Sequence, residues 1–200
     1  MSKISLQHGA IVLTAPSGSG KSTIARLIER EITSLQFSVS ATTRPPREGE
    51  QNGIDYHFIS SEAFKAGIDA GDFLEYEEVY PGRFYGTLFS EITRIDVHGP
   101  VLLDIDVKGA MRMKEYAGDS ALVLFIHPTS LEELSKRLKL RGTESPKWLQ
   151  ERIKRAEMEL TFADKCDHIV YNDILEDAVA ETLQVVRQFL KAKQNRLEHT

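Results

Sequence analysis

The residues best placed to do chemistry form a glycine-rich loop between two apolar segments. The loop, Ala15-Pro-Ser-Gly-Ser-Gly-Lys-Ser-Thr23, follows the apolar run Ala10–Leu13 and precedes Ile24–Ile28, whose apolar residues have helical spacing. A strand, a glycine-rich turn, Lys-Ser/Thr and a helix in this order are typical of a P-loop. Backbone N–H groups at such a helix N-terminus bind phosphate, since the helix dipole favours anions there. The sequence therefore predicts a nucleotide polyphosphate site.

Within this loop the expected roles follow from residue type. Gly18 and Gly20 permit backbone torsions and close approaches that a Cβ would prevent. Lys21 is expected to reach the β- and γ-phosphates, and the Ser22 hydroxyl to ligate Mg²⁺. Ala15 replaces the usual first glycine, a mild change because the tight part of the loop starts later. The predicted phosphate-binding residues are Ser17, Gly18, Ser19, Gly20, Lys21, Ser22 and Thr23.

A second candidate site lies at the end of an apolar strand, Val101–Ile105, which runs into Asp104 and Asp106. A carboxylate in this position resembles a Walker B aspartate and is expected near Mg²⁺. Because side chains two apart on a strand share a face, the two aspartates could act together. The alternative is that one of them is an exposed residue beginning a turn.

Two further features indicate a second phosphate and a base. Arg44 and Arg47 flank two prolines that stiffen their loop, which suits a phosphomonoester, although a solvated pair is an equal alternative. Glu75 stands between apolar neighbours, where a carboxylate is costly unless it finds donors. The N1–H and N2–H groups of guanine match such a carboxylate, and adenine lacks that pair. Tyr85 and Thr87 add hydroxyls around a glycine.

Elements that alternate between strand and helix must position these residues. This order predicts an α/β fold of the P-loop NTPase type, a parallel sheet flanked by helices with right-handed crossovers. Ligands then bind at the carboxyl ends of the strands. Strands are expected at 9–14, 36–43, 55–59, 73–80, 83–85, 101–105, 121–126 and 167–171; helices are expected at 21–32, 62–70, 88–97, 108–116, 130–140, 146–163 and from 175. Residues 36–87 are expected to form a β-rich insertion.

Composition limits the class of protein. The 200 residues fit one domain, 41% are hydrophobic, and no apolar run approaches the ~18 residues of a membrane span. The net charge of −5 argues against nucleic acid as the main partner. A single cysteine and the lack of a secretory signal predict a cytoplasmic location, and the six histidines show no metal-ligand spacing. The chain could be a monomer or a homo-oligomer.

Taken together, the sequence resembles the guanylate kinase family, which phosphorylates GMP at the expense of ATP. The resemblance covers residues 9 to 190 in the family's order. Its Thr-Thr-Arg-Pro-Pro-Arg-x-Gly-Glu stretch is far more specific than the P-loop. The matching stretches are Ser17–Thr23, Val39–Glu50, Gly53–Phe58, Phe73–Glu75, Phe84–Thr87, Leu103–Asp106 with Gly109, Arg137 with Arg141–Thr143, and Val170–Asp173.

By that resemblance, each site residue has an expected role. Thr87 stands where serine is common and Lys108 where glutamine is common. The expected ligands of the GMP phosphate are Arg44, Arg47, Tyr56 and Tyr85, and those of guanine are Ser40, Glu75 and Thr87, with Asp106 nearby. Arg137, Arg141 and Arg152 are expected to approach the transferred phosphate, and Asn172 to meet the ATP adenine. With Lys21 and Arg44, these three arginines are the expected catalytic residues; Ser22 and Asp104 are the expected Mg²⁺ ligands, partly through water.

The resemblance also implies an organisation and a reaction. The expected parts are a core (1–35, 88–136 and 151–200), a GMP-binding insertion (36–87) and a lid (137–150). The expected activity is γ-phosphate transfer from ATP to GMP and dGMP in purine nucleotide metabolism, with no general base because the attacking phosphate is already anionic. Two alternatives remain: a catalytically weak phosphopeptide-binding relative, and another P-loop nucleoside monophosphate kinase.

Overall fold

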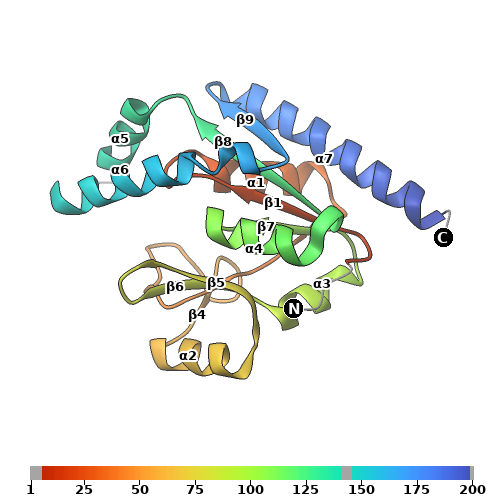
Figure 1. Cartoon of the computed structure of the whole chain (residues 1–200), viewed down its shortest axis with the longest axis horizontal. Coiled ribbons are helices and arrows are strands. Elements are labelled where there is room, and N and C mark those ends of the chain that lie inside the picture. The colour runs from red at the N-terminus through yellow and green to blue at the C-terminus, as the bar shows by residue number, and fades with distance from the viewer. Residues whose placement is uncertain (1–5, 141–145, 199–200) are drawn as a thin grey trace.

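The larger of two sheets places the P-loop at its centre (Figure 1). The computed structural model describes residues 6–140 and 146–198. The strand order is β2-β7-β1-β8-β9, and all neighbours are parallel. The strands are β1 (Ala10–Thr14), β2 (Gln36–Phe37), β7 (Val101–Asp104), β8 (Ala121–Pro128) and β9 (His168–Asn172). The expected P-loop-type parallel sheet is confirmed.

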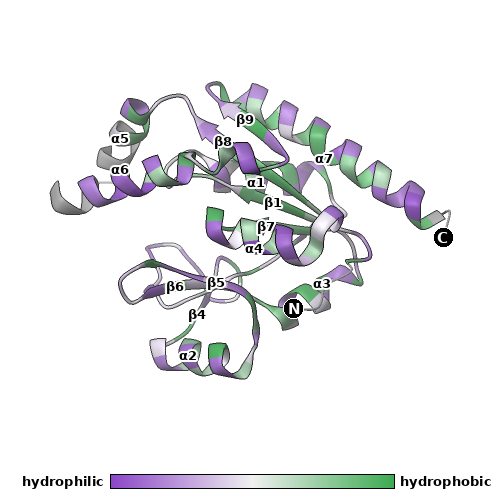
Figure 2. Ribbon diagram, in the orientation of Figure 1, coloured by the Kyte–Doolittle hydropathy of each residue, from purple (hydrophilic) through white to green (hydrophobic). Residues whose placement is uncertain are grey.

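Helices cover both faces of this sheet, which explains why its central strands are apolar up to their carboxyl ends. Along β1, Ile11 and Leu13 pack with α1 (Lys21–Glu31) and α7 (Leu175–Glu198). The alternate residues Ala10 and Val12 pack with α3 (Phe89–Asp96) and α4 (Val107–Ala117) on the other face. Figure 2 shows hydrophobic residues on the sheet and polar ones on the outer faces of the helices. The remaining helices are α5 (Leu131–Leu140) and α6 (Pro146–Leu160), with short 3-10 turns at Gly118–Ser120 and Ala163–Lys165.

A smaller sheet forms a separate layer beside α4 (Figure 1). Its order is β4-β3-β6-β5, and the pairs β3–β6 and β5–β6 are antiparallel. The helix α2 (Ser61–Ala70) packs on it through Phe64, whose ring stacks on Phe73 at 4.2 Å between centroids. Ser60 caps this helix and Gly71, at φ 74°, ends it. The strands are β3 (Ala41–Thr42), β4 (His57–Phe58), β5 (Phe73–Tyr80) and β6 (Arg83–Leu88).

One expected strand is divided. Residues 36–43 were expected as a single extended segment, but β2 pairs with β7 in the large sheet and β3 pairs with β4 and β6 in the small one. Ser38 to Ser40 cross between the sheets. The first two residues of the expected insertion, 36 and 37, thus lie in the core sheet. Alternating apolar residues predict an extended backbone, but they do not predict which neighbours it will pair with.

The carboxyl ends of the strands gather the candidate residues. β1 leads into the glycine-rich loop, where Gly18 and Gly20 have φ of 96° and 90°, and β7 ends at Asp104 beside it. The left-handed torsion of Gly20 lets the chain turn into α1. None of the helices in the described part of the chain combines the length and hydropathy needed to cross a bilayer.

Candidate functional site

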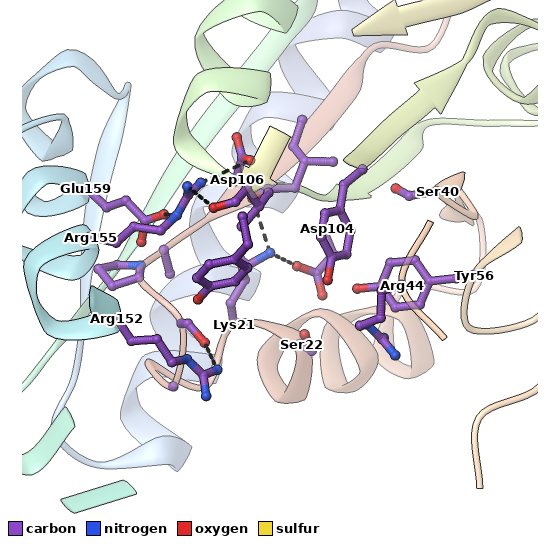
Figure 3. Close-up of a pocket in the computed structure, with 18 of the residues that line it drawn as sticks. Lys21, Ser22, Ser40, Arg44, Tyr56, Asp104, Asp106, Arg152, Arg155 and Glu159 are labelled. Carbon is purple, nitrogen blue, oxygen red and sulfur yellow. Dashed lines mark hydrogen bonds and ion pairs between the residues drawn. The ribbon is translucent and has the colours of Figure 1, made fainter. Parts of the chain in front are cut away.

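A pocket of roughly 1140 Å³, including its open mouth, lies between the P-loop, the small sheet and α6 (Figure 3). Residues separated by more than 130 positions in the sequence therefore face one space. The predicted site residues that line it are Ser17, Gly18, Gly20, Lys21, Ser22, Thr23, Ser40, Arg44, Arg47, Tyr56, Glu75, Tyr85, Asp104, Asp106 and Arg152.

At the P-loop end, the Lys21 ammonium donates to the Asp104 carboxylate and, at 3.1 Å, to the Ile105 carbonyl. Burial alone would lower the pKa of Lys21, but the Asp104 carboxylate outweighs it and raises that pKa. The lysine is therefore a fixed positive charge at the helix N-terminus. From the opposite wall, Arg152 on α6 donates to the Ser17 hydroxyl at 2.8 Å. This end of the pocket is suited to a polyphosphate.

At the other end, Arg44 is held in place by a carboxylate and two aromatic rings. Its two terminal nitrogens donate to Glu50 at 2.7 and 2.8 Å, and the guanidinium lies 5.1 Å from the Tyr56 ring centroid and 5.5 Å from that of Phe58. Burial lowers the pKa of Arg44, whereas the hydrogen bonds to Glu50 raise it. The hydrogen bonds outweigh burial, so the pKa of Arg44 lies above its usual value. Glu50 also accepts from the backbone N–H of Arg47 at 2.7 Å, which orders the loop.

Between the two ends, Glu75 is a buried carboxylate that faces the pocket. Its side chain is on β5, the residue is 4% exposed, and it accepts from the Thr87 hydroxyl at 2.6 Å. Burial raises its pKa to about 7, with Asp106 contributing in the same direction and the Thr87 hydrogen bond opposing. A buried carboxylate that faces a pocket in this way is placed to accept hydrogen bonds from a ligand.

Comparisons with known proteins agree with this geometry. The guanylate kinase family model matches residues 7–190. A guanylate kinase of Salinibacter ruber is 58% identical over 91% of this chain and 97% of its own, and one of Bacteroides thetaiotaomicron is 46% identical over 90% and 89%. The crystal structure of guanylate kinase from Anaplasma phagocytophilum has a TM-score of 0.72 at 30% identity, covering 93% and 86% of the two chains.

This chain belongs to the guanylate kinase family. The alternative of a P-loop kinase from another family is thereby not favoured, and neither is a binding module without activity. The expected enzyme class is confirmed: the protein is a nucleotide-dependent kinase.

Three predicted ligands lie behind the wall of this guanylate kinase pocket and not in it. Thr87 is fully buried, and its hydroxyl donates a hydrogen bond to the Glu75 carboxylate. Asn172, 5% exposed, donates through Nδ2 to the Ser19 carbonyl at 2.7 Å, so its amide supports the P-loop from β9. Ser19 itself is fully buried. The positions of Thr87, Asn172 and Ser19 indicate that these residues support the pocket-lining residues from behind.

The lid arginines cannot be placed in the same way. Arg141 falls outside the described residues, and so does the side chain of Arg137, although α5 includes its backbone. Most of the expected lid, 137–150, is therefore described only as the backbone of α5 and α6. The roles of Arg137 and Arg141 therefore stay predictions from the family resemblance.

Sequence reasoning missed two residues of α6 that line the pocket, Arg155 and Glu159. Arg155 donates from Nε to Glu159 at 2.8 Å and from Nη1 to the Val79 carbonyl of β5 at 2.6 Å. The signal was present in the spacing, since Arg152, Arg155 and Glu159 lie three and four residues apart and share one face of a helix. That this face of the helix points toward the pocket depends on how α6 packs against distant segments.

The residues of the pocket suit a magnesium ion that is bound partly by the protein and partly by the phosphates of a nucleotide. Asp104 supplies a carboxylate and Ser22 a hydroxyl at the P-loop end of the pocket. Within 6–140 and 146–198, no group of three or more His, Cys, Asp or Glu side chains could hold a metal. Mg²⁺ keeps several waters and is bound by one or two protein oxygens plus substrate phosphates, and Ser22 and Asp104 match the protein part of that donor set.

Proposed function

We propose that this pocket transfers the γ-phosphoryl group of ATP to GMP, giving ADP and GDP, with ATP on the P-loop and GMP against the small sheet. As a member of the guanylate kinase family, the protein is an ATP:GMP phosphotransferase. One observation supports the arrangement above all: the buried Glu75 carboxylate opens into the same pocket as the Lys21 ammonium.

Base selection rests on Glu75. Its ionised carboxylate accepts from guanine N1–H and N2–H, and Ser40, which also lines the pocket, supports the base edge. Adenine presents a bare acceptor at N1, so two acceptors would face each other and the carboxylate would stay buried without donors. A site built around a required hydrogen bond discriminates strongly against an analogue that lacks it.

The GMP phosphate is assigned to Arg44, Arg47, Tyr56 and Tyr85. All four line the pocket; Glu50 orients the Arg44 guanidinium and also accepts from the backbone N–H of Arg47. A guanidinium that is oriented before binding loses little freedom when it meets a phosphate in a bidentate manner. Tyrosine hydroxyls add neutral donors, which limits the positive charge that must be buried.

The chemical step needs positioning and charge more than proton transfer. An oxygen of the GMP phosphate, ionised because its second pKa is about 6, forms a bond to the γ-phosphorus while the bond to the β,γ-bridging oxygen breaks. Lys21 and Arg152 neutralise charge on the transferred group, with Arg137 and Arg141 assigned the same role from the lid. A bound Mg²⁺, held through Ser22 and Asp104, supplies further charge neutralisation on the donor phosphates.

Several finer assignments accompany this proposal. The insertion within 36–87 and the lid at 137–150 close over the two nucleotides and exclude water, which prevents hydrolysis of ATP. The enzyme acts on dGMP as well as GMP, works in the cytoplasm in purine nucleotide metabolism, and is a monomer or a homo-oligomer.

A coupled assay of ADP release tests the proposal directly. We expect turnover with GMP, much weaker turnover with AMP, CMP and UMP, and loss of turnover when Mg²⁺ is chelated. The Lys21→Ala variant, which removes charge from the donor site and leaves the Asp104 carboxylate without its ammonium partner, is expected to lose turnover and to melt at a lower temperature than the wild type. Equal rates with GMP and AMP would contradict the base assignment, and an active Lys21→Ala variant would contradict the donor assignment.

A further inference from the structure

Arg155 joins three parts of the molecule that belong to different ends of the pocket. It lies on α6, donates to the Val79 carbonyl on β5 of the small sheet, and its Nη2 lies 3.6 Å from Asp106 Oδ2 in the core. Figure 3 shows its guanidinium between Glu159 and Asp106. A side chain with contacts to three elements transmits a displacement of one to the others.

A buried carboxylate fixes the direction of this guanidinium. Glu159, one turn further along α6, is 4% exposed and accepts from Arg155 Nε at 2.8 Å. The Tyr80 ring lies beside it, with its centroid 5.7 Å from the guanidinium carbon. With Nε and one face occupied in this way, the two Nη atoms can only point toward β5 and Asp106.

The contact with Asp106 is incomplete. Asp106 Oδ1 accepts from the backbone N–H groups of Lys108 and Gly109 and so caps α4, while Oδ2 is buried without a hydrogen-bond partner among the described residues. Arg155 Nη2 is likewise buried and lacks one. A charge-assisted hydrogen bond would need about 2.8 Å, so a small approach of α6 would satisfy both atoms.

The same helix also touches the P-loop. Arg152, one turn before Arg155, donates to the Ser17 hydroxyl at 2.8 Å. Donor phosphates that draw Arg152 inward therefore move Arg155 toward Asp106 and β5, the strand that carries Glu75. The two arginines connect the donor end of the pocket to the acceptor end through one rigid helix.

We propose that Arg155 is a positioning residue that couples ATP binding at the P-loop to the geometry of the GMP site, through Val79 and Asp106. The proposal rests on the assigned activity and adds to it a reason for the two nucleotides to bind cooperatively. Arg155 does not need to contact either substrate. Its effect is expected on the affinity of one nucleotide in the presence of the other.

The test measures coupling by calorimetry. The dissociation constant of GMP is determined with and without a saturating, non-hydrolysable Mg²⁺–ATP analogue, for the wild type, Arg155→Met, Glu159→Gln and the control Lys154→Met. Methionine keeps a long side chain but removes the guanidinium, and Lys154 is the exposed neighbour on the same helix. Coupling between sites typically changes affinity by about 5- to 150-fold.

We expect the analogue to lower the dissociation constant of GMP for the wild type, and the ratio of the constants without and with analogue is the coupling factor. Arg155→Met should lower this coupling factor about fivefold or more, while changing the affinity for GMP alone less than about twofold. Glu159→Gln should lower the factor less, and Lys154→Met not at all. Independent binding in the wild type, or an unchanged factor in Arg155→Met and Glu159→Gln, overturns the proposal. A fall in kcat with unchanged coupling also overturns it, because Arg155 would then act on the phosphates directly.

Failure of this inference is distinguishable from failure of the assigned activity. If the wild type does not phosphorylate GMP, the assigned function is wrong whatever the variants do. If it does and the coupling factors of wild type and variants agree, only the role of Arg155 is wrong. Melting temperatures of all four proteins show whether a loss of coupling reflects loss of fold.

Discussion

At the scale of single residues, the proposed role of Glu75 in base recognition comes with a cost in stability. The carboxylate is nearly fully buried and accepts from the Thr87 hydroxyl. We expect Glu75→Gln to lower kcat/KM for GMP by about 2–3 kcal/mol in transition-state stabilisation and to leave the KM for ATP nearly unchanged. Steady-state kinetics with GMP and AMP measure this. An unchanged GMP-to-AMP ratio would remove Glu75 from base selection.

The raised pKa of Glu75 also predicts a pH-dependent stability. Its pKa rises from 4.5 to about 7 on folding because of burial, so the folded state binds more protons than the unfolded state between these values. The free energy of unfolding therefore falls as pH rises from about 4.5 to about 7, by up to ~3 kcal/mol for this group. Urea denaturation should show Glu75→Gln gaining stability relative to wild type at pH 8 and little at pH 5. A difference independent of pH would contradict it.

Gly109 is expected to determine where the Glu75 carboxylate lies. A Cβ at position 109 would overlap Glu75 Oε2 and stand 3.1 Å from its Cδ. Gly109→Ala removes a helix-destabilising glycine, worth about 1 kcal/mol, yet should displace Glu75 and lower the GMP-to-AMP selectivity. Combining it with Glu75→Asp shortens the carboxylate and relieves the overlap. The double variant should be more stable than the sum of the single effects implies; strict additivity would show that the two residues do not meet.

At the scale of elements, β9 supports the P-loop from behind. The Asn172 amide donates to the Ser19 carbonyl at 2.7 Å, and a Cβ at Gly20 would overlap its Nδ2. Asn172→Ala leaves a buried carbonyl without its donor, which costs about 1–3 kcal/mol. We expect a higher KM for ATP, a smaller change in the KM for GMP, and a lower melting temperature. Asp173→Ala, an exposed neighbour, is the control. A raised KM for GMP alone would contradict this role.

The predicted elements show which local signals were sufficient. The strand expected at 73–80 is observed over its whole length, and the helix expected at 130–140 begins at Leu131, with Ser130 accepting from the Glu133 N–H. The segment 36–43 was predicted as one strand and is two, in two sheets. Strand propensity acts over neighbouring residues, while sheet pairing depends on residues far along the chain, here Val101–Leu102 and Tyr85–Gly86.

At the scale of the whole molecule, one pocket contains residues proposed to bind each of the two nucleotides. Lys21, Arg44 and Glu75 all line it, so a ligand in which adenosine and guanosine are joined by a polyphosphate should span it. Such a bisubstrate compound loses the entropy of association once, and we expect a larger rise in melting temperature than with ATP and GMP together. Thermal melts at equal concentrations measure this; a rise no larger than that with GMP alone would show that the two ends do not form one site.

Removal of the metal should affect the two ends of the pocket differently. The oxygen donors assigned to Mg²⁺, Ser22 and Asp104, lie at the P-loop end of the pocket. With EDTA in place of Mg²⁺, the thermal stabilisation by ATP should therefore decrease, and that by GMP should stay. Equal losses for both nucleotides would place the metal elsewhere.

The sequence by itself determined the local chemistry of this guanylate kinase: the P-loop, the carboxylates that end β7, the arginines around two prolines and the carboxylate in β5. Only the tertiary structure decided that Glu75 is buried beside Gly109, that Asn172 and Thr87 act from behind the pocket, and that Arg155 reaches β5 and Asp106. Torsional freedom, charge and hydrogen-bonding type are properties of a residue and its neighbours. Burial, pKa and the partner of a side chain depend on distant segments that packing brings together.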